Sequence, residues 1–256
     1  MTLHHRLRAA AGNSIDSGVV FDFTNISSLY PYPYLPSGLY NRKSNLGLPQ
    51  TYSFVTAGLS IAGDAPNDGN SYPIAISTSF TGDYLFQMST RIDIDPSGSN
   101  WCSDAGIALF LNSGSTANVT STSWIWKWGH HSSRIAAQNN CPKPYLYGQS
   151  NTTVAQMTSP NTGKVLESPY VSSGDFVTMH LRHLPSQSKT TYKVTVGSKD
   201  WTESGTVLGT ANDGNQSSTG ILEKNDHFGS SSYHVGIGAD DDDDACIING
   251  FRYEAL

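Results

Sequence analysis

Acidic side chains offer the clearest starting point for chemistry in this sequence. Asp240, Asp242 and Asp244 belong to a run of five aspartates, whose charges repel one another unless water or a cation screens them. Their spacing matches the start of an EF-hand calcium loop, but Ala245 replaces its glycine and Phe251 replaces its bidentate glutamate. The run is therefore not an EF-hand. A solvated turn, which we favour, and a calcium site remain as alternatives, and no other cofactor is expected.

Hydrolysis of a glycosidic bond usually needs two carboxyl groups, one that donates a proton and one that attacks the sugar or activates water. The chain has only four glutamates, and no two of them are close in sequence. Asp93 and Asp95 share one face of an expected strand but stand at its end, just before Pro96. His180 and His183 do not form a metal pair, because residues three apart on a strand point to opposite faces. We therefore predict no catalytic residues and no enzyme activity.

Three tryptophans in one expected strand are candidates for ligand binding. Trp124, Trp126 and Trp128 fall on one face of that strand because side chains alternate in direction along it. They form either part of the core or a flat platform for a carbohydrate. We expect Trp126 in the core, with Trp124 and Trp128 near an edge where they can contact a sugar.

A segment rich in tyrosine and proline, residues 30–36, gives a second aromatic candidate. Its prolines remove alternate backbone donors, so the segment cannot be regular sheet and should form an extended strap. Tyr32 and Tyr34 can stack on a sugar or on a neighbouring chain. Packing across the edge of the fold is the alternative that we favour.

Strands and turns must carry these residues, because the composition disfavours helices. Ser, Thr, Asn and Gly abound, whereas good helix formers are scarce. Charged residues make up 14% of the chain, against about 25% in a typical soluble protein. No Pro-rich or charge-rich linker divides the sequence. We expect one all-β domain.

Residues 174–201 show the expected architecture most clearly, because two alternating runs face each other across a short polar loop. Residues 177–182 and 192–196 alternate between apolar and polar side chains, so one face of the hairpin should be buried and the other wet. Residues 185–188 supply the turn, and residues 197–200 supply a second reversal. A half-buried hairpin needs a second sheet against its apolar face. Further strands are expected in ranges 19–23, 54–62, 72–78, 83–95, 105–111, 122–128, 233–237 and 247–253.

Three stretches together resemble the concanavalin A-like lectin and glucanase domains. They are residues 86–112, residues 174–206 with their Lys-Asp-Trp turn, and residues 233–256 with their acidic turn. The likeness covers roughly residues 80–256 and is nearest to non-catalytic modules appended to some glycosidases. It implies a two-sheet antiparallel jelly-roll sandwich with long loops, in which calcium is often bound at loops such as 240–244.

The first 17 residues are expected to form an arm outside the domain, which would span residues 18–256. The arm is too short and too weakly amphipathic for an independently stable helix. Its basic start is similar to the opening of some tailed-phage virion proteins, which implies an anchor onto a larger assembly. The alternative is a frayed terminus. The residues expected to act in this anchor are His4, His5, Arg6 and Arg8.

Charge and cysteine usage exclude other classes. A net charge of −6 gives no electrostatic reason to bind nucleic acid or an anionic membrane. No apolar run reaches the length of about 20 residues that a membrane span needs, and the N-terminus lacks the apolar core of a signal peptide. Cys102, Cys141 and Cys246 have no zinc spacing, so we favour free buried thiols over a disulfide bridge.

These features lead to one main hypothesis and two alternatives. We expect a non-enzymatic virion protein, such as a capsid decoration or a fibre, assembled in the host cytoplasm without a signal peptide. Its partners would be other virion proteins, further copies of this chain and, through its aromatic residues, surface glycans. The first alternative is a carbohydrate-binding or receptor-binding lectin module. The second is a glycan-cleaving enzyme.

The calcium alternative is testable by thermal unfolding. A cation bound by the acidic run would raise the unfolding temperature by an amount that grows with the logarithm of its concentration. If so, Asp242→Asn and Asp244→Asn together should abolish the increase. Equal unfolding temperatures in EDTA and in millimolar calcium would leave the run as a solvated turn.

Overall fold

The computed structural model describes residues 18–32, 34–41, 52–62, 74–91, 105–111, 123–129, 143–147, 153–156, 176–207, 222–224, 229–238 and 245–256. Apart from one 3-10 turn, η3 (Pro185–Gln187), the regular elements in these ranges are strands. No helix in the described ranges is long and apolar enough to cross a membrane. The expected all-β class is confirmed.

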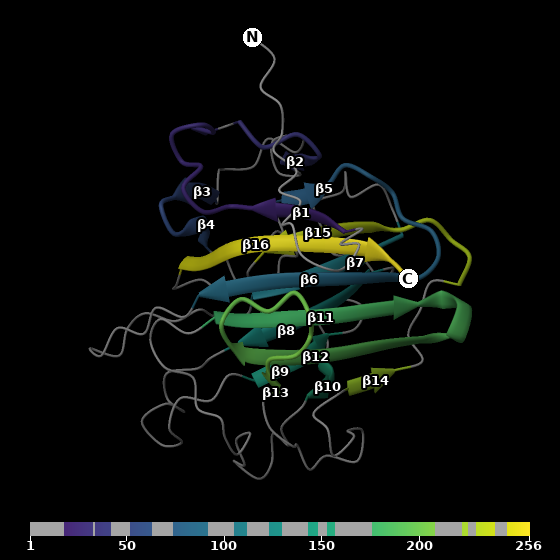
Figure 1. The fold of residues 1–256 in the computed structure, drawn as a ribbon. Helices are drawn as coiled ribbons and strands as arrows, with labels where there is room; N and C mark the ends of the chain where they lie inside the picture. The colour runs from purple at the N-terminus through teal and green to yellow at the C-terminus, as the bar shows by residue number, and fades with distance from the viewer. Residues whose placement is uncertain are drawn as a thin grey trace, which may run out of the picture.

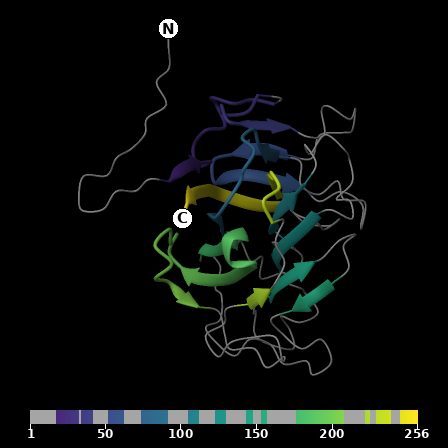
Figure 2. The ribbon, with the colours of Figure 1, turned by 90° about the vertical axis from the view of Figure 1, so that its right-hand side faces the viewer.

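The strands form two antiparallel sheets that pack face to face (Figure 1, Figure 2). Sheet A has nine strands in the order β13-β12-β11-β6-β16-β4-β3, with β1 paired to β16 and β14 paired to β12. Its strands are β1 (Val19–Asp22), β3 (Tyr52–Val55), β4 (Gly58–Ala62), β6 (Tyr84–Arg91), β11 (Phe176–Leu184), β12 (Lys189–Gly197), β13 (Thr206–Val207), β14 (Leu222–Lys224) and β16 (Ala245–Ala255).

Sheet B has seven strands in the order β10-β9-β8-β7-β15-β5-β2. Its strands are β2 (Leu39–Asn41), β5 (Ile74–Ile76), β7 (Ala105–Phe110), β8 (Ser123–Gly129), β9 (Lys143–Tyr147), β10 (Thr153–Gln156) and β15 (His234–Gly238). The chain crosses repeatedly between the sheets, so strands distant in sequence become neighbours. Such crossovers are typical of a jelly-roll sandwich.

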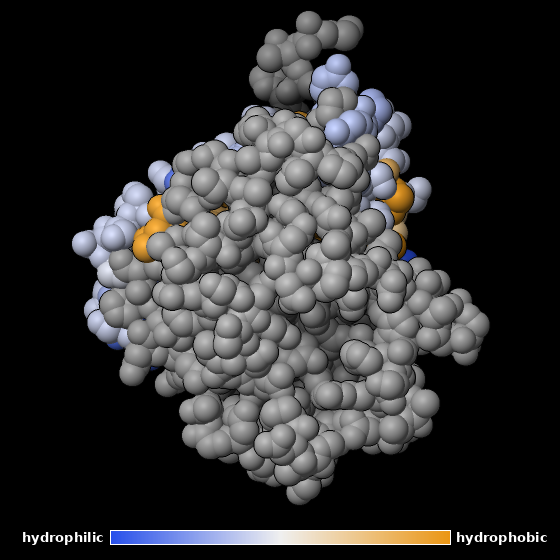
Figure 3. Space-filling view, turned by 180° about the vertical axis from the view of Figure 1, so that it is seen from behind, coloured by the Kyte–Doolittle hydropathy of each residue, from blue (hydrophilic) through white to orange (hydrophobic). Residues whose placement is uncertain are grey.

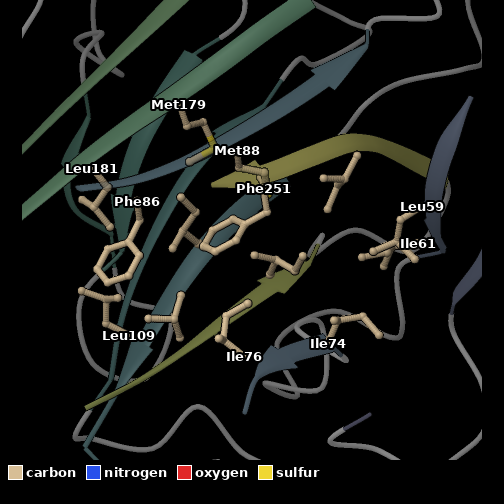
Figure 4. Close-up of a cluster of buried hydrophobic side chains, with 14 of the residues drawn as sticks. Leu59, Ile61, Ile74, Ile76, Phe86, Met88, Leu109, Met179, Leu181 and Phe251 are labelled. Carbon is tan, nitrogen blue, oxygen red and sulfur yellow. The ribbon is translucent and has the colours of Figure 1, made fainter. Parts of the chain in front are cut away.

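The core lies between the sheets and takes apolar side chains from both of them. Met88 of β6, Met179 of β11 and Phe251 of β16 come from sheet A, while Ile76 of β5 and Leu109 of β7 come from sheet B, and all are buried. Figure 4 shows these side chains pointing toward one another across the interior. Burying each such side chain contributes about 1.5–3 kcal/mol, so this layer holds the two sheets together.

The expected hairpin of residues 174–201 is confirmed as β11 and β12. Val177 pairs with Val196 and Leu184 pairs with Lys189. The polar loop forms η3, which ends at Ser188 in the left-handed conformation (φ 52°), and the Ser188 N–H donates to the Pro185 carbonyl. His180 and His183 point to opposite faces as predicted, since His180 hydrogen-bonds to Gln87 and His183 packs edge-on against Tyr233.

Residues 54–62 were expected to form one strand, and this prediction is wrong. They are parts of a second hairpin, β3 and β4, which begins at Tyr52 and turns at Thr56 and Ala57. Gly58, with φ at 154°, lies against the backbone carbonyl of Ile248 in β16, where a side chain would collide. The alternation of apolar residues continues through the turn, so the pattern alone did not reveal the reversal.

The prediction of a wet outer face on β11 is also wrong at its centre. Residues 198–205, here named the cover loop, follow β12 and fold back over the outer face of sheet A (Figure 1, Figure 2). Thr178 and His180 are buried beneath this loop. The ring of Trp201 lies beside Gly250 of β16. A turn that looked like a simple reversal in sequence therefore forms a third layer.

We predict that Gly250→Ala destabilises the protein by about 2 kcal/mol, because overpacking a close contact has a cost of this size. The new methyl carbon would lie 2.9 Å from the Phe21 carbonyl oxygen and 3.3 Å from Cζ2 of Trp201. Urea unfolding measures the change. Ser198→Ala, at an exposed position of the cover loop, is the control and should change stability by less than about 0.5 kcal/mol. Equal stability of Gly250→Ala and the unaltered protein would contradict this packing.

Candidate functional site

Two groups of described residues contain side chains suited to binding or catalysis. The first, here named the polar layer, lies between sheet A and the cover loop and comprises Gln87, His180, Thr195 and Arg252. The second is the tyrosine strap, the described part of residues 30–36. No cluster of three or more His, Cys, Asp or Glu suited to a metal ion occurs among the described residues.

Gln87 is the centre of the polar layer. Its side-chain oxygen accepts a hydrogen bond from Arg252 at 2.6 Å. Its amide nitrogen lies 2.8 Å from Nδ1 of His180 and 3.0 Å from the carbonyl oxygen of Trp201 in the cover loop. Arg252 fixes the orientation of the amide, because a guanidinium can only donate. Gln87 must therefore donate to both of its other partners.

His180 is consequently neutral, with its proton on Nε2. Nδ1 accepts from Gln87, and Nε2 lies 2.8 Å from the Thr195 hydroxyl, to which it donates. The imidazole is only 2% exposed, and burial lowers the pKa of His180 from its usual 6.5 to about 4. Near neutral pH this histidine carries no charge.

The nearby carboxylates stabilise the cover loop. Asp200 accepts hydrogen bonds from the backbone N–H and hydroxyl of Thr202 and from the N–H of Gly205. Burial is the largest single influence and raises the pKa of Asp200, but the hydrogen bonds from the loop together lower it below its usual value. Glu203 lies 2.6 Å from Arg182 and 3.5 Å from Lys193. The Asp200 hydrogen bonds hold the loop in its own shape, and the Glu203 ion pairs attach it to β11 and β12. The cover loop therefore closes over the polar layer.

The tyrosine strap is open to solvent. It links β1 of sheet A to β2 of sheet B, and its backbone turns where the Tyr34 N–H donates to the Pro31 carbonyl. Tyr32 is 47% exposed and Tyr34 is 66% exposed. Among the described residues, five of the seven exposed large hydrophobic side chains lie in the first part of the domain: Val19, Val20, Leu29, Tyr32 and Tyr34.

Packing at the edge of the sandwich holds the strap in place. The Tyr30 ring lies 6.2 Å from the ring of Phe54, and the Tyr32 ring meets the buried Tyr52 edge-on at 5.7 Å. Burial, followed by the neighbouring Tyr32, raises the pKa of Tyr52, while a hydrogen bond with Asn41 lowers it. The preference for edge packing is thus confirmed for Tyr30 and Tyr32. Tyr34 has no ring contact with another described residue.

The outer face of sheet B carries small side chains in its central strands. Gly106 and Ala108 of β7 lie beside Gly238 and Gly236 of β15, and the ring of Phe110 lies against Gly236. All five are buried. Figure 3 views this side of the molecule, where the coloured residues form only small, separate apolar areas. The described side chains named above are therefore small or buried and form no exposed aromatic platform.

The side chains of the remaining predicted site residues lie outside the part of the chain that the structure describes. The register pairs Trp124 with Leu109 and Trp128 with Ala105, but the tryptophan side chains lie outside the described part of the chain. Other predicted residues lie wholly outside it: Asp240, Asp242 and Asp244 of the acidic run, His4, His5, Arg6 and Arg8 of the arm, and Asp93 and Asp95.

Sequence reasoning missed the polar layer. Gln87, His180 and Arg252 come from three strands far apart in the chain, and each looked like an ordinary outward-facing polar residue. The signal that could have indicated burial was Trp201 close behind the hairpin, since a large apolar side chain in a turn usually needs a surface to cover.

Comparison with known proteins identifies the architecture. No protein-family model and no curated protein matches the sequence. The fold matches a lectin from Bauhinia forficata in complex with GalNAc, at a TM-score of 0.51 and 13% identity over 94% of this chain and 99% of that one. It also matches a Lotus tetragonolobus seed lectin, at a TM-score of 0.53 and 8% identity over 93% of this chain and 98% of that one. A third match is lectin I-B4 from Griffonia simplicifolia, at a TM-score of 0.53 and 12% identity over 93% of this chain and 99% of that one. The chain thus has the lectin-like sandwich fold.

Proposed function

We propose that this protein binds carbohydrate, and that Tyr32 and Tyr34 form the contact surface. The observation that carries the proposal is the pair of exposed tyrosines on a strap that the sandwich holds in place. A rigid aromatic ring can stack on the apolar C–H face of a sugar and loses little conformational entropy when it does so. The phenol hydroxyls add hydrogen bonds to sugar hydroxyls.

The fold supports the same proposal. The similar Bauhinia forficata lectin is in complex with GalNAc, and lectin I from Ulex europaeus, with a TM-score of 0.51 at 8% identity, is in complex with a fucose glycoside. Function does not follow from fold alone. The proposal for this chain therefore depends on the exposed tyrosines as well as on the fold. The resemblance gives no support to the virion role expected from the sequence.

The tyrosines are preferred to Trp124 and Trp128 as the platform. Tyr32 and Tyr34 are exposed to solvent, whereas the side chains of Trp124 and Trp128 lie outside the part of the chain that the structure describes. The platform is therefore assigned to the strap.

Binding should depend on the aromatic rings of the strap. With a glycan selected on an array, Tyr34→Ala should weaken binding by about 1 kcal/mol, roughly a fivefold rise in Kd. Tyr32→Ala should act in the same direction, and Tyr34→Phe should retain most of the affinity. Isothermal titration calorimetry measures each Kd.

Leu29→Ala is the matched control, because Leu29 is an exposed apolar residue near the strap without a ring. It should leave Kd unchanged. Absence of binding to every glycan tested would overturn the proposed function. Binding that survives the double change of Tyr32 and Tyr34 to Ala would keep the function but remove the strap from the site.

We also propose that the protein does not cleave the glycan that it binds. The solved structures with this fold reported above are lectins, and the sequence lacks a close pair of glutamates. Incubation with a polysaccharide panel should release no reducing ends. Release that Asp93→Asn or Asp95→Asn abolishes would show that these aspartates are catalytic.

A further inference from the structure

We propose that the cover loop is a pH-sensitive lid on sheet A, which lifts when His180 gains a proton. The proposal is independent of carbohydrate binding. It follows from the way one amide side chain connects the histidine to the loop.

Gln87 makes the connection. Its amide group donates to Nδ1 of His180 and, with the same nitrogen, to the Trp201 carbonyl of the cover loop. Its oxygen is held by Arg252. Arg252 and the Trp201 carbonyl fit only one orientation of this amide, because a guanidinium can only donate and a carbonyl oxygen can only accept.

Protonation of His180 is incompatible with that arrangement. A proton on Nδ1 would face the N–H₂ group of Gln87, so two donors would meet within 2.8 Å. Rotating the amide would offer its oxygen to the imidazolium, but the nitrogen would then face the guanidinium of Arg252. The same rotation would break the bond to Trp201, which is one of the attachments of the loop.

The charges around His180 come from β11, β12, β16 and the cover loop. Arg182 on its own strand and Lys193 on β12 are cationic and disfavour the imidazolium, and Arg252 on β16 is a third cation, bonded to Gln87. The acidic groups are Asp200 and Glu203 in the loop, which favour it, and Glu254, which is paired with Arg252. Burial is the largest influence and opposes the charge, and it keeps the pKa of His180 near 4 while the lid is closed.

Opening must also break the other attachments of the loop to the sheet. Glu203 lies 2.6 Å from Arg182, whose side chain is 39% exposed, and 3.5 Å from Lys193, while Lys199 lies 3.9 Å from Asp22, whose side chain is 61% exposed. Exposed ion pairs contribute little, so solvent limits how strongly the Arg182 and Lys199 pairs hold the loop. Closure also has a cost, because the buried hydroxyl of Ser89 has no hydrogen-bond partner among the residues that the structure describes. Lifting the loop would hydrate Ser89, Thr178 and His180, and thereby present a polar sheet face.

The sign of the pH dependence follows from the two states. In the closed state the pKa of His180 is about 4, and in the open state a hydrated imidazole titrates near 6.5. Closure is therefore strongest above about pH 6.5 and weakens as the pH falls toward 4. By linkage, the equilibrium constant for opening should rise about fiftyfold between about pH 7 and pH 4.5.

Amide hydrogen exchange measured by mass spectrometry tests the lid. After correction for the intrinsic effect of pH, the exchange rate of amides in residues 198–205 should rise about fiftyfold between about pH 7 and pH 4.5. The amides of β6 and β11 should stay protected. His180→Gln, which cannot titrate, should abolish the rise. Equal loss of protection in β6 and β11 would mean general unfolding and would overturn the proposal.

Gln87→Glu provides a second test that needs no acid. A glutamate of the same shape accepts from Arg252 and from a protonated His180 but cannot donate to the Trp201 carbonyl. The variant should exchange rapidly in residues 198–205 at neutral pH, and NMR titration should show a higher pKa for His180. A protected loop in this variant, or a pH response that persists in His180→Gln, would also contradict the lid.

Discussion

Sheet A depends on one strand, β16, which pairs along its length with three others. One edge of β16 binds β6, and the other edge binds β4 first and β1 afterwards. The partner strand changes from β4 to β1 at a register shift between Ile248 and Gly250. There the Asn249 side chain donates to the Ala57 carbonyl, and the Asn249 carbonyl accepts from the Phe23 N–H. Without this strand, β1, β3 and β4 would be separated from β6 and its hairpin partners.

The same place in β16 governs how the outer face is closed. Gly250 leaves room for the ring of Trp201, and Arg252, two residues later on the same face, fixes the amide of Gln87. The register shift in β16 and the cover loop are thus linked through Gly250 and Arg252. A polar layer of this kind is stable only when its members are satisfied, which explains why a single proton on His180 can have an effect on a whole loop.

Short-range patterns predicted the fold class and the main hairpin, because alternation with period two reports strands directly. The division of residues 54–62 into two strands was missed, since apolar residues continue through the turn. The burial of His180 was also missed, because it depends on a loop and two strands that meet only in three dimensions. Tyr32 and Tyr34 were recognised as candidates from the prolines around them, but only the structure shows that Tyr32 packs on Tyr52 while Tyr34 stays exposed.

A crystal structure of the protein with the glycan that it binds most tightly would test the central claim most directly. The account predicts a sugar ring stacked on Tyr34, with its carbon atoms within about 4 Å of the aromatic ring, and contact with Tyr32 at the same edge of the sandwich. A glycan bound over the outer face of sheet B, with both tyrosines still exposed to solvent, would contradict it.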